Sequence, residues 1–399
     1  MRILIANCYF APAWGYGGPT RLLYELAGRL SACGHQVTVI TSDASDGAGR
    51  YAGADSLEDN VRVVRCKTVS QYLAFQCKQF IAPAYPGEMR RHIDKADIVH
   101  LSGSRDYFTT FGAALARQCR RPYVLAAYGT LPATGPGWRG MVKPYFDRLI
   151  TRRTVQHAAA CLAQTQHEAA VYTEFGVSLQ RIHLTPLASD GDRFRQLPQR
   201  GSFRASMGLT GKHRVLLFVG RIHPLKGLDI LIDALAIACK REPLLRLVVV
   251  GRDDGHEAFL RSRIQSIGLH GIVLWAGPLY GADVVKAYVD ADAFILTPRH
   301  FEETSLAGVE ACFCGSQAIV TEEAEIPHLV EYGAGAMVKN DVREIAAAIL
   351  AAVADDGTIQ NRGRAAREMA FAEFEWSRVL RQYVSVYERA LTVQTSAVQ

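Results

Sequence analysis

The sequence predicts an α/β protein made of two doubly wound domains, each built on a parallel sheet. The chain has 399 residues, more than a single hydrophobic core usually organises. Short runs rich in β-branched residues alternate with helical stretches along it, which is the pattern of strands joined by helical crossovers. A polar, turn-rich segment over residues 196–212 divides these runs into two series and precedes a new strand.

The strands of both series can be assigned from their β-branched runs. The first series reads RILIANC, QVTVIT, VRVVR, DIVHL and PYVLAAY, and the second reads RVLLFVG, LRLVVVG, IVLWAG, DAFILTP and QAIVTE. The predicted domains are residues 1–195 and 196–375, followed by an amphipathic helix over 376–399. Because open parallel sheets bind ligands beyond the carboxyl ends of their strands, the chemistry is expected there.

Composition excludes several classes of protein. Hydrophobic residues make up 49% and charged residues 21%, which is an ordinary folded composition. No stretch is long and apolar enough to span a bilayer, and the first residues lack a secretion signal. We therefore expect a cytoplasmic protein, either free or at the inner face of the cell membrane. The nine cysteines are scattered and include no C-x-x-C pair, which disfavours a disulfide framework or a zinc site.

Charge is distributed unevenly along the chain. The net charge is +6, but residues 1–185 hold 21 Lys and Arg against 13 Asp and Glu, whereas residues 186–399 hold 24 against 26. The first part is therefore basic and the second slightly acidic. This asymmetry predicts that the first half meets an anionic partner such as a lipid headgroup, a phosphorylated acceptor or nucleic acid.

Two cations follow the first strand of the second series. Arg221 comes directly after RVLLFVG, and Lys226 opens the helical pattern KGLDILIDALAIAC. The start of a helix offers unpaired backbone N–H groups and the positive end of the helix dipole. Together these features predict a diphosphate site at the carboxyl end of this strand.

A pair of glutamates follows the strand DAFILTP. Glu302 falls in a loop and Glu310 on the next helix, with the spacing E-x7-E. A loop carboxylate can accept hydrogen bonds from sugar hydroxyls, and a helix carboxylate can bind the vicinal hydroxyls of a ribose. The amides of Thr304, Ser305 and Leu306 are expected to face phosphate oxygens.

These blocks resemble the retaining GT-B glycosyltransferases grouped as family 4, over nearly the whole chain. The matching blocks, in order, are GYGGPTRLLYELAGRLSACGHQVTVIT, PLASDGDRF, GRIHPLKGLDILIDAL, VVVGRDDG, WAGPLYGADVVKAYVDADAFILTP and EETSLAGVEACFCGSQAIVTE. The resemblance implies two facing Rossmann-like domains, with the C-terminal helix crossing back to the first. It also implies a nucleotide-diphosphate sugar as donor, no cofactor and no nucleic-acid partner.

Site residues carried over from the resemblance fall into two groups. The catalytic residues it implies are Glu302, Arg221, Lys226 and Tyr128. The donor-binding residues it implies are Gly17, Gly18, Arg221, Lys226, Gly277, Leu279, Glu302, Thr304, Ser305, Leu306 and Glu310. In these roles Arg221 and Lys226 hold the diphosphate, Glu310 holds the nucleotide ribose and Glu302 lies beside the donor sugar.

The chain departs from the family pattern at three places, one of which is His328, where relatives commonly have a glutamate after Ile-Pro. Thr304 and Ser305 stand where relatives usually have Phe-Gly, and Tyr128 stands where many have a histidine before Gly-Thr-Leu. In enzymes of this type the leaving diphosphate is thought to take the acceptor proton, so a histidine base is not required and Tyr128 is expected to orient the sugar. No metal is expected, because Asp290 and Asp292 form a D-x-D sequence between a helix and an apolar strand, which is typical of a structural pair.

The acceptor side allows more than one interpretation. The segment over residues 138–153 mixes cationic and apolar side chains, which is typical of a helix lying on an anionic membrane and also of one packed on its own sheet. The resemblance implies a sugar or lipid-linked sugar acceptor and a role in cell-surface polysaccharide or glycolipid assembly. The alternatives are a nucleotide-sugar epimerase of GT-B shape and a non-catalytic sugar-nucleotide-binding subunit. A nicotinamide dehydrogenase is disfavoured, because the loop from Asn7 to Gly15 is too long for a dinucleotide fingerprint.

Overall fold

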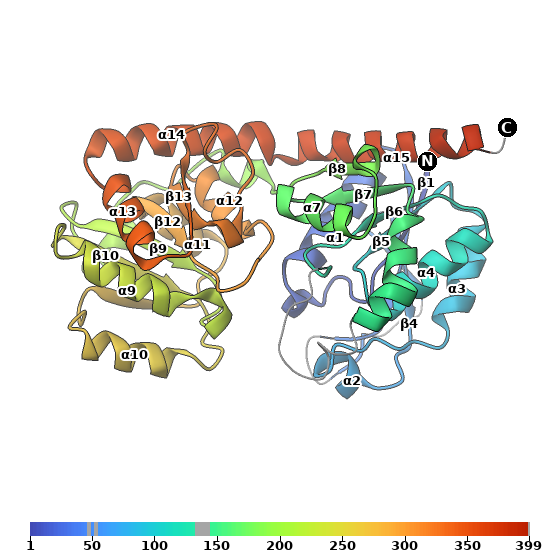
Figure 1. The fold of residues 1–399 in the computed structure, drawn as a ribbon, viewed down its shortest axis with the longest axis horizontal. Helices are drawn as coiled ribbons and strands as arrows, with labels where there is room; N and C mark the ends of the chain where they lie inside the picture. The colour runs from blue at the N-terminus through green and yellow to red at the C-terminus, as the bar shows by residue number, and fades with distance from the viewer. Residues whose placement is uncertain (46–48, 52–54, 132–143, 398–399) are drawn as a thin grey trace. The chain divides into compact units, whose positions relative to one another are not determined.

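A computed structural model describes residues 1–45, 49–51, 55–131 and 144–397. The chain forms two compact units (Figure 1). Unit 1 contains Met1–Thr185 and Val379–Gln399, and unit 2 contains Pro186–Arg378. Each unit has its own sheet and is described by itself.

Unit 1 is built on an eight-stranded sheet in the order β3-β4-β2-β1-β5-β6-β7-β8. All neighbouring strands pair in parallel except β3, which is antiparallel to β4 at the edge. The strands are β1 (Arg2–Ala6), β2 (Gln36–Ser42), β3 (Asp55–Glu58), β4 (Val61–Cys66), β5 (Ile98–Ser102), β6 (Tyr123–Ala126), β7 (Ala160–Ala163) and β8 (Ile182–Leu184). The order of the strands reverses between β1 and β5.

Helices cover both faces of this sheet. They are α1 (Gly18–Ala32), α2 (Gln71–Phe75), α3 (Tyr85–Ile93), α4 (Tyr107–Gln118), α6 (Arg152–Gln156), α7 (Gln166–Glu174) and α15 (Trp376–Ala397), with η1 (Trp14–Tyr16), η2 (Asp147–Thr151) and η3 (Leu179–Arg181). Successive residues of a strand point to opposite faces. Val99 and Leu101 of β5 join the core cluster that contains α3 and α4, whereas His100 between them hydrogen-bonds Tyr387 of α15.

Unit 2 has a six-stranded, all-parallel sheet in the order β11-β10-β9-β12-β13-β14. Counted within the unit this is the Rossmann order 3-2-1-4-5-6, so its topological switch point lies between β9 and β12. The strands are β9 (Arg214–Val219), β10 (Leu245–Val250), β11 (Val273–Gly277), β12 (Ala293–Leu296), β13 (Gln317–Thr321) and β14 (Gly335–Val338). The aliphatic side chains of β9, β10, β12 and β13 are almost wholly buried, as expected for strands covered on both faces, whereas those of the edge strands β11 and β14 are mostly only partly buried.

Two groups of helices flank this second sheet (Figure 1). The helices of unit 2 are α8 (Ser202–Ser206), α9 (Leu228–Ala238), α10 (Glu257–Ser266), α11 (Ala282–Asp290), α12 (Leu306–Phe313), α13 (Val342–Ala352) and α14 (Asp356–Glu373), with η4 (Gly191–Phe194), η5 (Pro224–Lys226) and η6 (Glu322–Ala324). Helix α9 packs against α10 and α13, while α12 packs against α11 and α14. In Figure 1, α9 and α10 lie on one side of the strands and α12 and α14 on the other.

Every strand run named from the sequence is a strand in the structure. The described residues also contain strands that the sequence analysis did not predict, namely β3, β7, β8 and β14. These strands are only three or four residues long, or lie at a sheet edge, and so carry little periodicity.

The observed division of the chain lies at 185/186 rather than at the predicted 195/196. Residues after Pro186 pack inside unit 2, because the ring of Phe194 stacks on Phe313 of α12. Most of the turn-rich segment 196–212 is likewise built into unit 2, since it contains α8 with the buried side chains of Phe203 and Arg204. Polarity along the chain therefore did not locate the division between the two units.

The final helix, α15, belongs mostly to unit 1. Its residues from Val379 onward are part of that unit, whereas the residues before it belong to unit 2. Tyr383 and Tyr387 are fully buried against unit 1. None of the helices in the described residues is both long and apolar enough to cross a bilayer.

Candidate functional site

The switch point of unit 2 gathers the polar residues predicted for donor binding. Strand β9 leads through Gly220 and Arg221 to η5, which ends at Lys226, and α9 starts two residues later. Strand β12 leads through residues 297–305 to α12. Carboxyl ends of parallel strands meet at one edge of a sheet, so these two loops are neighbours.

A glycine lets the two loops come close together. Gly227 adopts φ +63, and a Cβ built on it would lie 1.8 Å from the carbonyl oxygen of Thr297. The hydroxyl of Thr297 donates to the Gly227 carbonyl at 3.1 Å, and the Arg299 amide donates to the Leu225 carbonyl at 2.9 Å. Only glycine fits at this position, because both the backbone angle and the close contact exclude a side chain.

The first predicted cation, Arg221, is largely exposed at the end of β9. Its guanidinium forms an ion pair of 2.7 Å with Asp254, and 59% of its side chain is accessible to solvent. The loop that carries Asp254 is held by hydrogen bonds between Ile222 and residues 252 and 254. Arg221 is therefore positioned by the loop after β10 and remains available to an anion.

Lys226 and Glu302 contact each other directly. The sequence predicted that both bind the donor, Lys226 at its diphosphate and Glu302 at its sugar. The Lys226 ammonium forms a charge-assisted hydrogen bond with Glu302 Oε1. The Glu302 backbone amide also donates to the carbonyl of Glu323 at 2.6 Å. The side chain of Glu302 is 35% exposed and that of Lys226 17%, so the pair lies at the rim of the sheet edge and not in its core.

The segment before α12 differs in part from the expectation. Thr304 is buried, and its hydroxyl has no hydrogen-bond partner among the described residues. The Ser305 hydroxyl accepts from the Gly308 amide at 3.3 Å and thereby caps α12. The two extra hydroxyls are therefore used or enclosed within unit 2, and the predicted role of the Thr304, Ser305 and Leu306 amides does not depend on them.

Glu310 lies on α12 with different partners from Glu302. It is buried, its Oε2 accepts from the Tyr288 hydroxyl at 3.3 Å, and its Oε1 accepts from Arg193 at 3.4 Å. Burial and the neighbouring Glu310 carboxylate raise the pKa of Tyr288 well above its usual value, so Tyr288 remains a donor. Arg193 and Tyr288 were not predicted from the sequence, because they come from η4 and α11, far from Glu310 in the chain.

Gly277 is the last residue of the edge strand β11, and Leu279 follows two residues later. Gly277 has φ +70, and its carbonyl accepts from the Gly251 amide at 2.9 Å. Leu279 is partly buried against the core of unit 2. Both lie in the turn before α11, at the carboxyl edge of the same sheet.

In unit 1, Gly17 and Gly18 begin α1 after β1. Gly17 has φ +96 and ψ −157, a conformation essentially restricted to glycine. Both glycines are exposed, and a Cβ on either would meet no atom within 4 Å. Backbone geometry therefore requires glycine at position 17, whereas the structure of unit 1 alone imposes no such need at Gly18.

Tyr128 follows β6 in a strained and well-supported loop. Its φ is +48, unusual for a bulky residue, and its hydroxyl lies 3.4 Å from that of Tyr383. Burial raises the pKa of Tyr128 well above its usual value. The hydroxyl is thus engaged with α15 inside unit 1 and is a poor proton acceptor.

A buried carboxylate and an arginine hold this loop. Glu168 accepts from the amides of Gly129 at 2.9 Å and Gln164 at 2.8 Å. Arg105 donates to the carbonyls of Thr130 and Leu131 and forms an ion pair of 2.6 Å with Asp147. Neither Glu168 nor Arg105 could be identified from the sequence, because nothing in the local pattern links them to Tyr128.

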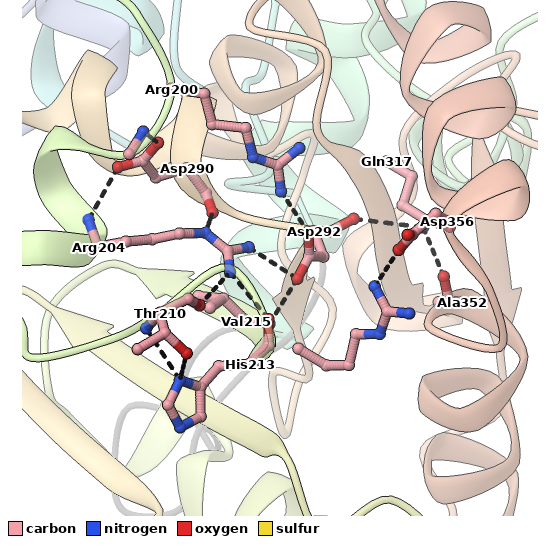
Figure 2. A network of polar contacts seen from close by, with 12 residues as sticks. Arg200, Arg204, Thr210, His213, Val215, Asp290, Asp292, Gln317, Ala352 and Asp356 are labelled. Atoms are coloured by element: carbon pink, nitrogen blue, oxygen red, sulfur yellow. Dashed lines mark hydrogen bonds and ion pairs between the residues drawn. The ribbon is translucent and has the colours of Figure 1, made fainter.

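The D-x-D sequence has a structural role (Figure 2). Asp290 accepts from the amides of Gly201 and Arg204, at 2.5 and 2.8 Å. Asp292 accepts from the Val215 amide at 2.7 Å and forms ion pairs with Arg204 and Arg200. Asp290 holds the first amides of α8, and Asp292 ties α8 to the amino end of β9, away from the carboxyl edge that carries Lys226. They are buried in an arginine network and not arranged as open metal ligands.

Comparison with known proteins covers both units. Residues 17–188 match the family model "Glycosyl transferase 4-like domain", and residues 199–369 match "Glycosyl transferases group 1". A D-inositol 3-phosphate glycosyltransferase of Jonesia denitrificans is 27% identical over 59% of this chain, and the alignment spans only 58% of that relative. A GDP-mannose:cellobiosyl-diphosphopolyprenol alpha-mannosyltransferase of Xanthomonas campestris is 26% identical over 78% of each chain.

The architecture also matches solved structures. The crystal structure of Anabaena Alr3699/HepE in complex with UDP superposes with a TM-score of 0.73 at 19% identity, covering 97% of this chain and all of that one. At this identity the likeness concerns the fold. The two parallel-sheet units are those of a GT-B protein.

Proposed function

Because the chain belongs to the group 1 glycosyltransferases of GT-B fold, we propose that it transfers a sugar, with retention, from a nucleotide-diphosphate sugar to a hydroxyl acceptor. The observation that carries this proposal is the Lys226–Glu302 pair at the switch point of unit 2, beside Arg221 and the start of α12. This edge combines two cations for a diphosphate with a carboxylate for sugar hydroxyls.

Donor binding would use these groups in succession along the ligand. Glu310, oriented by Tyr288 and Arg193, would accept hydrogen bonds from the ribose hydroxyls. Arg221, Lys226 and the first amides of α12 would face the diphosphate. The diphosphate would compete with Glu302 for Lys226, and a released Glu302 carboxylate would then accept hydrogen bonds from the sugar. Gly277 and Leu279 would border the base, and Gly17 and Gly18 are proposed as donor-binding residues from the resemblance alone.

The transfer step needs charge stabilisation more than a protein base. The bond between the anomeric carbon and the leaving phosphate oxygen breaks, and the acceptor oxygen forms its bond on the same face of the sugar. The acceptor proton passes to the leaving phosphate oxygen. Arg221 and Lys226 stabilise the charge that grows on the diphosphate, so we propose a reaction without a metal ion or cofactor. We assign Tyr128 the positioning of its loop, because its hydroxyl is engaged with Tyr383.

We further propose a lipid-linked sugar acceptor at an anionic membrane, in cell-surface polysaccharide or glycolipid assembly. The Xanthomonas relative is named for a diphosphopolyprenol acceptor. In the described part of the basic segment, Tyr145 and Leu149 expose 73% and 65% of their surface, next to the exposed Arg148 and Arg152. Apolar side chains flanked by arginines complement an anionic bilayer. Residues 138–143 of this segment lie outside the described residues.

Product analysis tests the proposed reaction. Purified protein would be screened with UDP-, GDP- and ADP-sugars by thermal shift, since a ligand that binds the folded state raises the melting temperature. The stabilising donor would then be incubated with a lipid-linked acceptor, and NMR would give the anomeric configuration of the product. Conversion of the donor sugar without any acceptor would identify an epimerase instead. Donor binding without turnover on any acceptor would identify a non-catalytic subunit.

A further inference from the structure

A groove in unit 1 concentrates positive charge outside the site described above. It lies between β4, with its edge neighbour β3, and helix α3, and it encloses a cavity of about 640 Å³. Its charged and titratable lining residues are Asp55, Arg62, Arg65, Lys67, Glu88, Arg91, His92 and Lys95. Cations therefore outnumber carboxylates in this lining.

Neighbouring arginines neutralise the carboxylates of the groove. Asp55 is paired with Arg62, and Glu88 with Arg91 at 2.6 Å. Lys67 and Lys95 are exposed, and neither forms an ion pair within the part of the chain that the structure describes. The two lysines thus leave a net positive charge in a concave surface, which attracts an anion more strongly than a flat surface does.

The cations are spread along the groove and not gathered at one point. Lys67 follows the carboxyl end of β4, while Arg62 lies near the amino end of the same strand. At about 3.3 Å per residue the two positions are roughly 17 Å apart. Lys95 follows the last turn of α3, whose partly buried His92 also lines the groove. This spacing suits a ligand that carries more than one anionic group.

The pKa of His92 depends on the charged residues of the groove. Its pKa is lowered by burial and by Arg62, while Glu88 and Asp55 raise it and Lys95 lowers it further. A neutral imidazole at neutral pH can still donate one N–H to an anion. A bound anion would favour the imidazolium and raise the pKa, so this histidine reports locally on occupancy.

We propose that the groove between β4 and α3 binds phosphate esters, as a subsite for a phosphate-bearing acceptor. The uneven charge of the sequence supports this, because the residues before 186 carry the excess of Lys and Arg. The role as an acceptor subsite rests on the proposed transfer function, whereas phosphate binding itself does not. The switch point of unit 2 holds separate cations for the donor diphosphate.

NMR of the His92 ring tests the groove directly, in the full chain and without donor or turnover. A His92→Gln variant identifies the signal. Pyrophosphate should raise the His92 pKa in the wild-type protein. The Lys67→Gln/Lys95→Gln variant should need about tenfold more pyrophosphate for the same rise, because the groove loses two positive charges. The matched control, Arg90→Gln/Arg117→Gln, removes the same charge from exposed positions that do not line the groove, and should titrate like wild type.

The outcomes separate this proposal from the donor site. No pyrophosphate-dependent rise at His92, or the same midpoint in both double variants, would overturn the proposal even in an active transferase. If pyrophosphate raises the His92 pKa as expected but the protein has no transferase activity, the groove binds phosphate and only its role as an acceptor subsite is rejected. Cosedimentation with anionic vesicles assigns the source of the phosphate. Loss of vesicle binding in the Lys67→Gln/Lys95→Gln variant alone indicates lipid headgroups, and equal binding by both double variants indicates a soluble phosphate ester.

Discussion

The carboxyl edges of the two sheets share a topology and differ in chemistry. In unit 2 the edge carries ionic groups that are partly exposed and paired with one another, as Lys226 is with Glu302. In unit 1 the corresponding edge carries Tyr128, whose hydroxyl is enclosed against Tyr383, and Glu168, which is fully buried. A doubly wound sheet therefore supplies a place for a ligand but not its chemistry, which depends on the side chains that follow each strand.

The largest effect on turnover is expected from removing the Lys226 ammonium of unit 2. Lys226→Ala should lower turnover by about 100- to 1,000-fold, because the lysine acts on charge that develops in the transition state. Binding of the bare nucleoside should change little. Steady-state kinetics and nucleoside titration would measure both effects, with Lys286→Ala as the control, since Lys286 pairs with Asp283 on the surface of the same unit. Similar small losses in both variants would show that the unit 2 edge is no more functional than an ordinary surface.

Replacing glycine by alanine should destabilise the protein more at Gly227 in unit 2 than at Gly17 in unit 1. Gly17 and Gly227 both have positive φ, but only Gly227 lies against a backbone oxygen. Gly17→Ala should lower the free energy of unfolding by about 1 to 2 kcal/mol through backbone strain. Gly227→Ala should cost more than about 3 kcal/mol, because the loops after β9 and β12 must separate. Hydrogen exchange resolved by unit would measure both, and equal costs would contradict the close contact.

Substitution of Glu310 tests the nucleotide side of unit 2 without changing its shape. Glu310→Gln should weaken binding of the nucleoside diphosphate by about 10- to 100-fold, since hydrogen bonds to a charged acceptor become neutral. Isothermal titration would measure the affinity. Glu331→Gln, an exposed glutamate beside His328, provides the control. Unchanged affinity in Glu310→Gln would remove this residue from the donor site.

The smallest effects on stability are expected from two carboxylates that accept hydrogen bonds from backbone amides, one of them buried and the other exposed. Burial raises the pKa of Glu168 in unit 1 to about 7, whereas amide hydrogen bonds lower the pKa of the exposed Asp253 in unit 2. The stability contributed by Glu168 is complete below about pH 4.5 and is lost as the pH rises through about 7. The stability contributed by Asp253 is present at neutral pH and is lost as the pH falls below its usual value near 3.8.

Urea unfolding at a series of pH values would compare these two carboxylates. As the pH rises from about 4.5 to 7, the unfolding free energy of the wild type should fall relative to that of Glu168→Gln. The difference for Asp253→Asn should be flat over that range and shrink only in acid. The same pH trend for both variants would show that burial does not decide whether a carboxylate's pKa is raised or lowered.

Local patterns in the sequence determined the α/β class, most of the strands and the residues that follow them. The sequence could place Arg221, Lys226, Glu302 and Glu310 after the strands β9 and β12, because all four fall in the loop or helix that follows one of these strands, and their donor roles stay a prediction. The same proximity identified the structural D-x-D pair, which lies just before the apolar run of β12.

Only the tertiary structure decided which partners these residues have. Arg193 reaches Glu310 across 117 residues of sequence, and Tyr288 reaches it from another helix. Glu168 holds the Tyr128 loop from α7, and the division of the chain falls at Pro186 because Phe194 packs on α12. Periodicity and spacing report what a residue's own segment does, whereas hydrogen bonds, burial and pKa values depend on segments that folding brings together.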